Sequence, residues 1–194
     1  MPFVLTVDQR ASRRGPDRVD EVLTRLPTAP TVLPFERTAG DEFQGVLDDP
    51  DAVVGAVLEL LRDGAWSVGV GAGPVQTPLP SSTRAAAGPA FLSARRAVDA
   101  AKQRVTHVAV RGAVPTDAED AQAVLGALAV VVERRSPQAW EAIALVEDGR
   151  TQAEAAASLG ISRQAVGQRL AAGLWELERD LRPTAARLLA RAAG

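Results

Sequence analysis

The feature that most constrains this 194-residue chain is a run of small and apolar residues near its C-terminal end, TQAEAAASLGISRQAVGQR at positions 151–169. Apolar residues recur there at the spacing of two short helices that face one core, namely Ala155, Leu159, Ile161 and Val166. Gly160 falls where the chain turns after the first helix, because a residue without Cβ adopts the left-handed conformation at little cost. Ser162 then stands as the N-cap of the second helix. The pattern predicts two helices joined by a tight turn.

The second of these predicted helices carries polar side chains that suit the base edges of duplex DNA. Its outward residues are Arg163, Gln164, Gln168 and Arg169. Arginine pairs with guanine and glutamine with adenine in the major groove, where a helix-turn-helix unit places its second helix. The sequence therefore predicts a helix-turn-helix whose partner is double-stranded DNA. A helical hairpin that only packs against protein is the alternative.

The charge of this region bears on how tightly it can hold DNA. Residues 136–194 carry seven Arg and seven Asp or Glu, whereas nucleic-acid-binding domains are usually basic. Residues 160–173 are more favourable, with two Arg and no acid. Because phosphate contacts supply most of the affinity, we expect modest, salt-dependent binding by one copy. A homodimer would strengthen it, since helix-turn-helix proteins commonly read paired half-sites.

Composition excludes several classes of site. The chain has no cysteine, which rules out disulfides and thiolate metal sites, and a single histidine, His107, which rules out a multi-histidine metal centre. We expect His107 to be packed or partly exposed rather than catalytic. The longest apolar run, 123–132, is too short to span a bilayer, and no basic-then-apolar leader opens the chain. We therefore expect a cytoplasmic protein with no membrane partner.

The apolar periodicity predicts an α+β fold. Strands are expected at 2–7, 66–73 and 106–110, a hairpin at 35–47, and helices at 16–26, 49–61 and 88–103, with a loop at 28–33 and an irregular segment at 74–82. This order predicts a ferredoxin-like βαββαβ sheet with an added helix and strand. Later helices are expected at 117–135, 137–147, 170–181 and 184–193, with Pro183 ending the helix at 170–181. The predicted domains are 1–114, a connecting or dimerisation helix at 115–135, and a DNA-binding domain at 136–194.

The predicted helix at 117–135 has a broad apolar face that must be buried. The face consists of Val124, Leu125, Leu128, Val131 and Val132. It either covers the sheet or pairs with its twin in a homodimer, and we favour the dimer. Trp140 and Trp175 flank the helix-turn-helix at apolar positions, so we expect them to anchor a core rather than to stack on bases.

Two carboxylates of the N-terminal half are expected to converge. Asp8 ends the first strand, and Asp41 lies at the turn of the hairpin. In a ferredoxin-like sheet these elements are neighbours, and two carboxylates at one point can hold Mg²⁺, which commonly shares its ligands with phosphates. Backbone N–H groups of residues 9–15, ahead of a helix, can face those phosphates. The alternative is that Asp41 is only a turn residue beside Gly40.

Four blocks of sequence carry a resemblance to a known group of proteins. FVLTVDQR, RTAGDEF, WSVGVGAGPV and AAAGPAFLSARRAVDAAK, in this order, resemble the blocks of class III nucleotide cyclases, whose palm-like fold diguanylate cyclases share. Together with the C-terminal helix-turn-helix, residues 2–180 resemble the SatD family of bacterial proteins. The cyclase resemblance implies a dimer, a purine nucleotide and two metal ions. It places Asp8 and Asp41 at the metal-binding aspartates, with Gln9 lending a backbone carbonyl.

The resemblance also implies roles for two arginines and reveals two departures. Arg37 falls where cyclases keep a base-reading lysine, and Arg96 falls on the arginine that steadies the transition state. Leu92, however, stands where cyclases have a catalytic asparagine, and Ala85 where they have a base-reading aspartate. Losing one preorganised polar group typically costs on the order of 10²–10³ in rate. We therefore expect no cyclase activity and assign no catalytic residue, while nucleotide or metal binding remains open.

The basic residues of the same region have two interpretations. Arg95 and Arg96, with Arg84 and Lys102 nearby, either line an anion pocket opposite the carboxylates or form a solvated helix face.

The residues together favour a dimeric DNA-binding transcriptional regulator. Its catalytically degenerate cyclase-like domain would sense a nucleotide or another phosphorylated ligand, which shifts DNA affinity only by binding two states differently. The expected cofactor is Mg²⁺ with a purine nucleotide, or none. One alternative is a metal-dependent nucleotide-processing enzyme whose helix-turn-helix docks a partner. Another is a palm-like domain that serves only as a dimerising scaffold.

Overall fold

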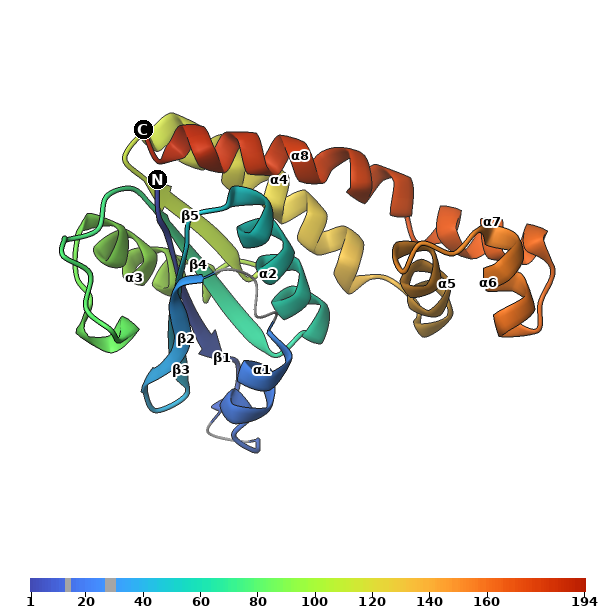
Figure 1. Ribbon diagram of the computed structural model, residues 1–194, viewed down its shortest axis with the longest axis horizontal. Helices are drawn as coiled ribbons and strands as arrows, with labels where there is room; N and C mark the ends of the chain where they lie inside the picture. Colours follow the sequence, from blue (N-terminus) through green and yellow to red (C-terminus); the bar gives the residue numbers. More distant parts are fainter. Residues whose placement is uncertain (13–14, 27–30) are drawn as a thin grey trace.

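The computed structural model describes residues 1–12, 15–26 and 31–194, and within these ranges it confirms the α+β class with a five-stranded sheet and eight α-helices (Figure 1). The first part of the chain forms β1 (Phe3–Gln9), α1 (Val19–Arg25), β2 (Thr31–Ala39), β3 (Glu42–Leu47), α2 (Pro50–Asp63), β4 (Trp66–Ala72), the 3₁₀ turn η2 (Thr83–Ala85), α3 (Pro89–Ala101) and β5 (Val108–Gly112). The rest is helical, with α4 (Pro115–Glu133), α5 (Pro137–Glu147), α6 (Gln152–Leu159), α7 (Arg163–Ala172) and α8 (Trp175–Ala192). The loop predicted at 28–33 and the phosphate-facing segment predicted at 9–15 lie partly outside the described residues.

The strands lie in the order β2-β3-β1-β4-β5. β1 is antiparallel to both β3 and β4, β2 is antiparallel to β3, and β5 is parallel to β4. The register places Asp8 opposite Glu42, and the Gln9 N–H donates to the Asp41 carbonyl at 3.2 Å. The end of β1 is therefore held beside the turn of the β2–β3 hairpin. β2 begins earlier than predicted because it is an edge strand, where Pro34 needs no partner for an N–H group.

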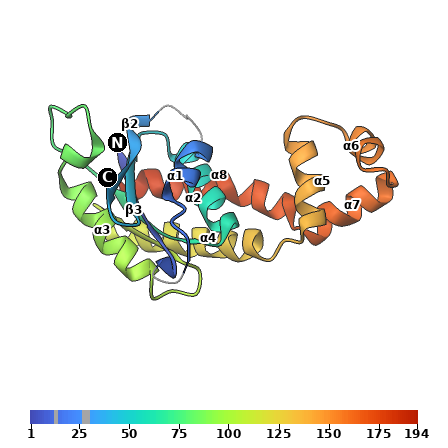
Figure 2. The same cartoon turned by 90° about the horizontal axis from the view of Figure 1, so that it is seen from below.

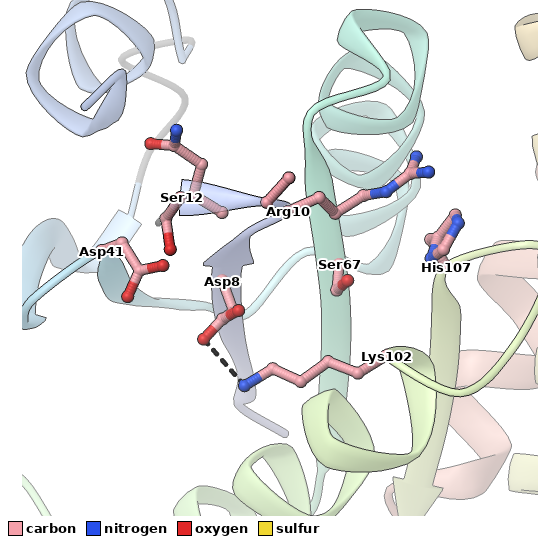
Figure 3. A pocket seen from close by; sticks show the side chains of 9 residues that line it. Asp8, Arg10, Ser12, Asp41, Ser67, Lys102 and His107 are labelled. Carbon is pink, nitrogen blue, oxygen red and sulfur yellow. Dashed lines mark ion pairs between the residues drawn. The ribbon is translucent and has the colours of Figure 1, made fainter. Parts of the chain in front are cut away.

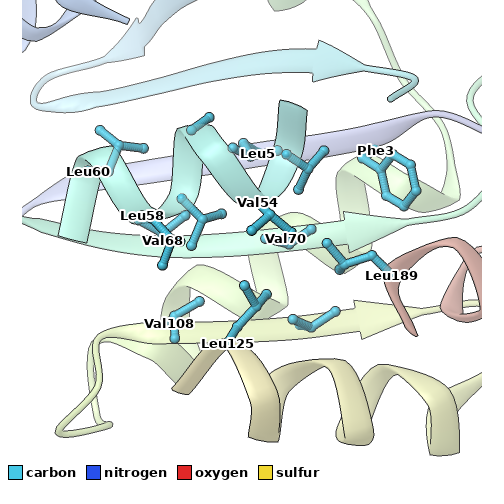
Figure 4. Packing of buried hydrophobic residues seen from close by; sticks show 14 of the residues in the cluster. Phe3, Leu5, Val54, Leu58, Leu60, Val68, Val70, Val108, Leu125 and Leu189 are labelled. Atoms are coloured by element: carbon cyan, nitrogen blue, oxygen red, sulfur yellow. The ribbon is translucent and has the colours of Figure 1, made fainter. Parts of the chain in front are cut away.

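The two faces of the sheet are covered differently. On one face, alternating apolar residues of the strands pack with α2, α4 and α8 into the main core, as Leu5, Val70 and Leu125 do in Figure 4. On the other face lies α3. A Cβ on Gly69 would sit 2.2 Å from the Val98 nitrogen, and one on Gly71 would sit 2.1 Å from the Ala90 oxygen. These glycines let the backbone of α3 lie directly on β4, which fixes where the basic residues of α3 reach the sheet.

The apolar face of α4 is buried within its own chain. Leu125, Leu128 and Val132 are almost completely buried and belong to the same core as Leu189 of α8. Of the two predicted alternatives, the structure therefore has the one in which this helix covers the sheet. This face accordingly gives no argument for a dimer.

The last helix packs against the sheet domain. The sequence instead predicted that residues 136–194 form a domain of their own. Ala185, Ala186 and Leu189 of α8 lie in the main core, and the Val114 N–H donates to the Ala192 carbonyl at 3.1 Å. The helices α5, α6 and α7 form a separate lobe that stands away from the sheet (Figures 1 and 2). The chain thus leaves the sheet along α4, forms the lobe, and comes back along α8.

The predicted helix break at Pro183 is wrong, because α8 runs through it. Pro183 is exposed, where water can bind the carbonyl that loses its partner. The burial of Ala185, Ala186 and Leu189 on the opposite side favours the continuous helix. The helical conformation is interrupted instead between α7 and α8, where Leu174 has a φ of 51°.

The α5–α7 lobe is built as the local sequence predicts. Its small core contains Ala142, Ile143, Ala155, Ala156, Val166 and Leu170. Gly160 has the predicted left-handed conformation, with φ 65° and ψ 32°. The Ser162 hydroxyl caps α7 by accepting the Ala165 N–H at 3.1 Å, and Thr151 with Glu154 forms a capping box at the start of α6. The predictions for Gly160 and Ser162 are confirmed.

A buried ion pair joins the end of α4 to the start of α8 at the base of the lobe. Arg135, just after α4, pairs with Glu178 of α8, and both side chains are almost fully buried. The Arg135 Nε also donates to the Gly173 carbonyl at 2.6 Å. Trp140 of α5 lies between two guanidinium groups, with its ring centre 4.0 Å from Arg62 and 4.7 Å from Arg135. Trp140 is thus an anchor between the lobe and the sheet domain, in keeping with its predicted structural role.

Candidate functional site

The outward face of α7 is the first candidate surface. Arg163, Gln164 and Gln168 are exposed and line a shallow hollow with Gln152 and Gly167. Val166 and Leu170 turn into the core of the lobe, so the positions on the other side of the helix point outward. The chain therefore presents three long polar side chains in a row on a helix whose opposite side is fixed.

Arg169, the fourth predicted DNA-binding residue, is placed differently. It is half-buried, and its Nη1 lies 3.2 Å from Glu141 Oε2 of α5. The same nitrogen lies 3.5 Å from the Gln138 carbonyl. Arg169 is therefore held sideways against α5, and its charge is offset by Glu141.

A polar cleft at the end of β1 is the second candidate site (Figure 3). It has a volume of about 630 Å³ and is lined by Asp8, Gln9, Arg10, Ala11, Ser12, Asp41, Ser67, Lys102 and His107. Its walls come from the end of β1, the β2–β3 turn, the start of β4, the end of α3 and the segment before β5. The structure thus brings Asp8 and Asp41 into one cleft, with Asp8 at the end of β1 and Asp41 in the β2–β3 turn.

Asp8 has a cationic partner within the cleft. The Lys102 Nζ lies 2.8 Å from Asp8 Oδ2 (Figure 3). The same nitrogen lies 3.9 Å from Asp99 Oδ1. The Asp8 side chain is only 20% exposed, so this ion pair is partly shielded from water. The negative charge of Asp8 is therefore offset from within the chain.

A second pair of this kind lies further along the same face of the sheet. Arg95 of α3 pairs with Glu42, whose side chain is almost fully buried. The Thr38 hydroxyl donates to Glu42 Oε1 at 2.8 Å. Of the basic residues considered for an anion pocket, Lys102 and Arg95 instead neutralise carboxylates of the sheet, whereas Arg96 is exposed on α3 and lies outside the lining of the cleft.

Arg37 also lies outside the lining of the cleft. Its Nη2 is 2.7 Å from Asp17 Oδ1 and 3.5 Å from Asp20 Oδ1. The hydrogen bond to Asp17 raises the pKa of Arg37. Arg37 links the segment before α1 to the edge strand β2, and its ion-pair partners are Asp17 and Asp20 rather than Asp8 or Asp41.

Arg10, Ser67 and His107 also line the cleft, although they were not predicted as site residues. His107 is half-buried, and burial, with a smaller contribution from Arg10, lowers its pKa, so its imidazole is neutral at pH 7. His107 lines the cleft because the end of α3 lies beside the start of β5. No spacing of residues near His107 in the sequence predicts this contact. For Ser67, the alternation of β4 is a usable signal, since it puts Ser67 on the same face as Gly69 and Gly71.

The cleft has few side chains that could bind a metal ion. No cluster of three or more His, Asp or Glu side chains suited to a metal ion occurs in the part of the chain that the structure describes. The two carboxylates of the cleft are accompanied by Lys102 and Arg10. This set does not fit the two metal ions that the cyclase resemblance implies.

Comparisons of the chain with protein-family models, curated proteins and solved structures found no match. No helix among the described residues combines the length and apolar character needed to cross a membrane. Function must therefore be argued from the α7 face and the cleft themselves.

Proposed function

We propose that this protein binds double-stranded DNA through the outward face of α7, as a helix-turn-helix transcriptional regulator. The observation that carries the proposal is the exposed row of Arg163, Gln164 and Gln168 on a helix whose other side is locked into the lobe core. The major groove of DNA admits an α-helix, and arginine and glutamine are the side chains that read guanine and adenine there.

The spacing on α7 suits base contacts. Arg163 is the first residue after the Ser162 N-cap, and the N-terminal residues of a second helix are those that contact bases in such units. Gln164 and Gln168 are one turn apart, which is about 6 Å along the helix axis. That length corresponds to roughly two base steps, so the two amides can read nearby base pairs. The positive end of the helix dipole also favours approach to phosphates.

The sheet domain fits a sensory or scaffolding role in this proposal. Four of its strands have the order β4-β1-β3-β2 with antiparallel neighbours, which supports a ferredoxin-like, palm-like domain as the resemblance to cyclases and the SatD family suggests. Leu92 is 64% exposed and apolar where cyclases carry a catalytic amide. A degenerate domain that holds the lobe, with or without a nucleotide ligand, accounts for these residues better than a cyclase does.

One copy should bind DNA only modestly. Arg163 is the only arginine of α7 on the outward face, since Arg169 is ion-paired with Glu141. Because phosphate contacts provide most of the affinity, the proposal includes two copies on one DNA site, the usual arrangement for helix-turn-helix proteins.

Binding of selected duplexes tests the proposal. Wild-type full-length protein is used to enrich duplexes from a random library, and fluorescence anisotropy then measures affinity at about 50 and about 200 mM salt. We expect Arg163→Ala/Gln168→Ala to weaken binding at least about 10-fold, since each good base contact is worth about 1–3 kcal/mol. The matched control is Gln103→Ala/Arg104→Ala, which removes the same residue types from an exposed position after α3.

Two results would contradict the proposal. One is failure of the wild type to enrich any duplex, and the other is equal affinity of the α7 variant and the wild type. An unchanged thermal unfolding midpoint in both double variants confirms that any loss of binding comes from the surface and not from unfolding.

A second function is favoured by one observation, the presence of Asp8 and Asp41 in a single cleft. It is that of a nucleotide-processing enzyme whose lobe docks a partner. Incubation with GTP or ATP plus Mg²⁺ or Mn²⁺ tests it. Turnover that disappears in Asp41→Asn would favour the enzyme, and no turnover would favour the regulator.

A further inference from the structure

We propose that Lys102 is the resident cation of the polar cleft, and that its ammonium group excludes a divalent metal ion from Asp8. The Lys102 Nζ lies 2.8 Å from Asp8 Oδ2, so one of the two oxygens that this carboxylate could offer a metal ion is already paired with a cation. The inference concerns the sheet domain alone and does not depend on DNA binding by α7.

The packing of α3 fixes Lys102 at this position. Ala97 and Ala101 on the last turns of α3 are fully buried against Ala109 of β5, and Gly69 and Gly71 let the helix lie directly on β4. Lys102 is the C-cap of this helix, and its N–H donates to the Val98 carbonyl at 3.0 Å. A cation is also favoured at the C-terminal end of a helix. The ammonium group thus reaches Asp8 from a rigid base.

The charges of the cleft leave a divalent ion poorly supported. Magnesium in proteins is held by one or two carboxylates together with waters or phosphates. With Asp8 paired to Lys102, Asp41 is the other carboxylate of the lining. Arg10 also lines the cleft, but its guanidinium donates to the Gly64 carbonyl at 2.9 Å. Lys102 is therefore the basic residue that meets the carboxylates here, with Asp99 Oδ1 a further 3.9 Å from its Nζ. A divalent ion on Asp8 would have to displace the ammonium and then tolerate it nearby.

This assignment explains why the donor set departs from the two-metal pattern of cyclases. The departure lies at the site itself, in addition to Leu92 and Ala85 in the flanking blocks. Removing the positive charge of Lys102 should then reveal the latent carboxylate pair as a metal site.

Titration of the full chain with Mn²⁺ alone tests the proposal by calorimetry and by the electron paramagnetic resonance signal of the free ion. The neutral variant is Lys102→Met, which keeps an apolar stem of similar length, and Lys102→Ala serves as a second neutral variant should the first be poorly folded. We expect either to bind one Mn²⁺ at least about 10-fold more tightly than the wild type, because the repulsion from the ammonium group is gone. Lys102→Arg, which keeps the charge, should behave as the wild type does.

A double variant locates the new site. Lys102→Met/Asp8→Asn should lose the gained affinity, because Asp8 supplies a ligand. Equal Mn²⁺ binding by the wild type and the neutral variants, whether tight or absent, would overturn the proposal. Gained binding that survives in the double variant would overturn it as well. Neither result bears on DNA binding, so the two proposals fail separately.

Discussion

Arg169 of α7 and Glu141 of α5 form an ion pair across the lobe, with 3.2 Å between Nη1 and Oε2. The pair holds one of the two arginines of α7 against protein instead of leaving it to solvent. If α7 lies in the major groove, Glu141 both restrains Arg169 and repels the phosphates beside it. On the proposed function, Glu141 would then limit the affinity of the lobe for DNA.

We predict that Glu141→Gln raises the affinity for a selected duplex by roughly threefold at low salt, because it frees one arginine and removes one negative charge. The gain should shrink as salt is raised. Fluorescence anisotropy measures it, with the exposed Glu119→Gln of α4 as a control for the same change of charge. Equal gains in both variants would show that only net charge matters.

Gly160 has a positive φ of 65°, and no atom lies within 4 Å of a Cβ built on it. Gly160→Ala should therefore lower the free energy of unfolding by about 1–2 kcal/mol through backbone strain alone. Gly55→Ala in α2 is the matched control, since it also has open space but lies within a helix, and it should stabilise by about 0.5–1 kcal/mol. Urea unfolding measures both. A Gly160→Ala variant as stable as the wild type would contradict the backbone strain expected at this turn.

The buried pair of Arg135 and Glu178 joins the end of α4 to the start of α8 at the base of the lobe. Glu178→Ala should lower the free energy of unfolding by about 3–5 kcal/mol, because it leaves a buried guanidinium without its carboxylate. Arg135→Met/Glu178→Leu should be much closer to the wild type, because both charges are removed together. Urea unfolding measures the free energy of unfolding of both variants and of the wild type. A double variant as unstable as Glu178→Ala would mean that the ion pair itself, and not the orphaned charge, matters.

Asp63 at the end of α2 should give the protein an acid-sensitive contact. Burial raises its pKa, but the hydrogen bonds from Trp66 Nε1, at 2.7 Å, and Arg18 Nη2, at 2.9 Å, outweigh burial and hold the pKa of Asp63 below its ordinary value of 3.8. A carboxyl group with a lowered folded pKa stabilises the fold above its unfolded pKa, and this stability is lost as pH falls through the folded value.

The matching experiment compares wild type with Asp63→Asn. The wild type should be more stable from pH 7 to pH 5 by a constant margin, and the margin should shrink below about pH 4. Unfolding by urea at a series of pH values measures it. A margin that is the same at all pH values would show that the carboxylate charge contributes nothing.

The extent to which the sequence predicts the structure depends on how local each contact is. Gly160 and Ser162 were predictable, because a left-handed turn and an N-cap are set by the residue and its immediate neighbours. The convergence of Asp8 and Asp41 in one cleft followed from the expected order of strands. The first depends on neighbouring residues alone, and the second depends on the strand order that the alternation of elements predicts.

Other parts depend on tertiary contacts that no local pattern contains. Pro183 stays within α8 because Leu189 and its neighbours are buried against the core, and that burial is decided by α4. The pairing of Lys102 with Asp8 depends on how closely α3 approaches β4. The sequence left Lys102 either in an anion pocket opposite the carboxylates or on a solvated helix face, and it did not identify Asp8 as its partner.

The most direct test of the account is whether α7 touches DNA. The chain has no cysteine, so Gln164→Cys offers one thiol for a photo-crosslinker on the outward face of α7, and Gln103→Cys offers one on an exposed site after α3. The account predicts crosslinks to a selected duplex from position 164 that unlabelled duplex competes away, and none from position 103. Crosslinking from position 103 alone, or equally from both positions, would contradict it.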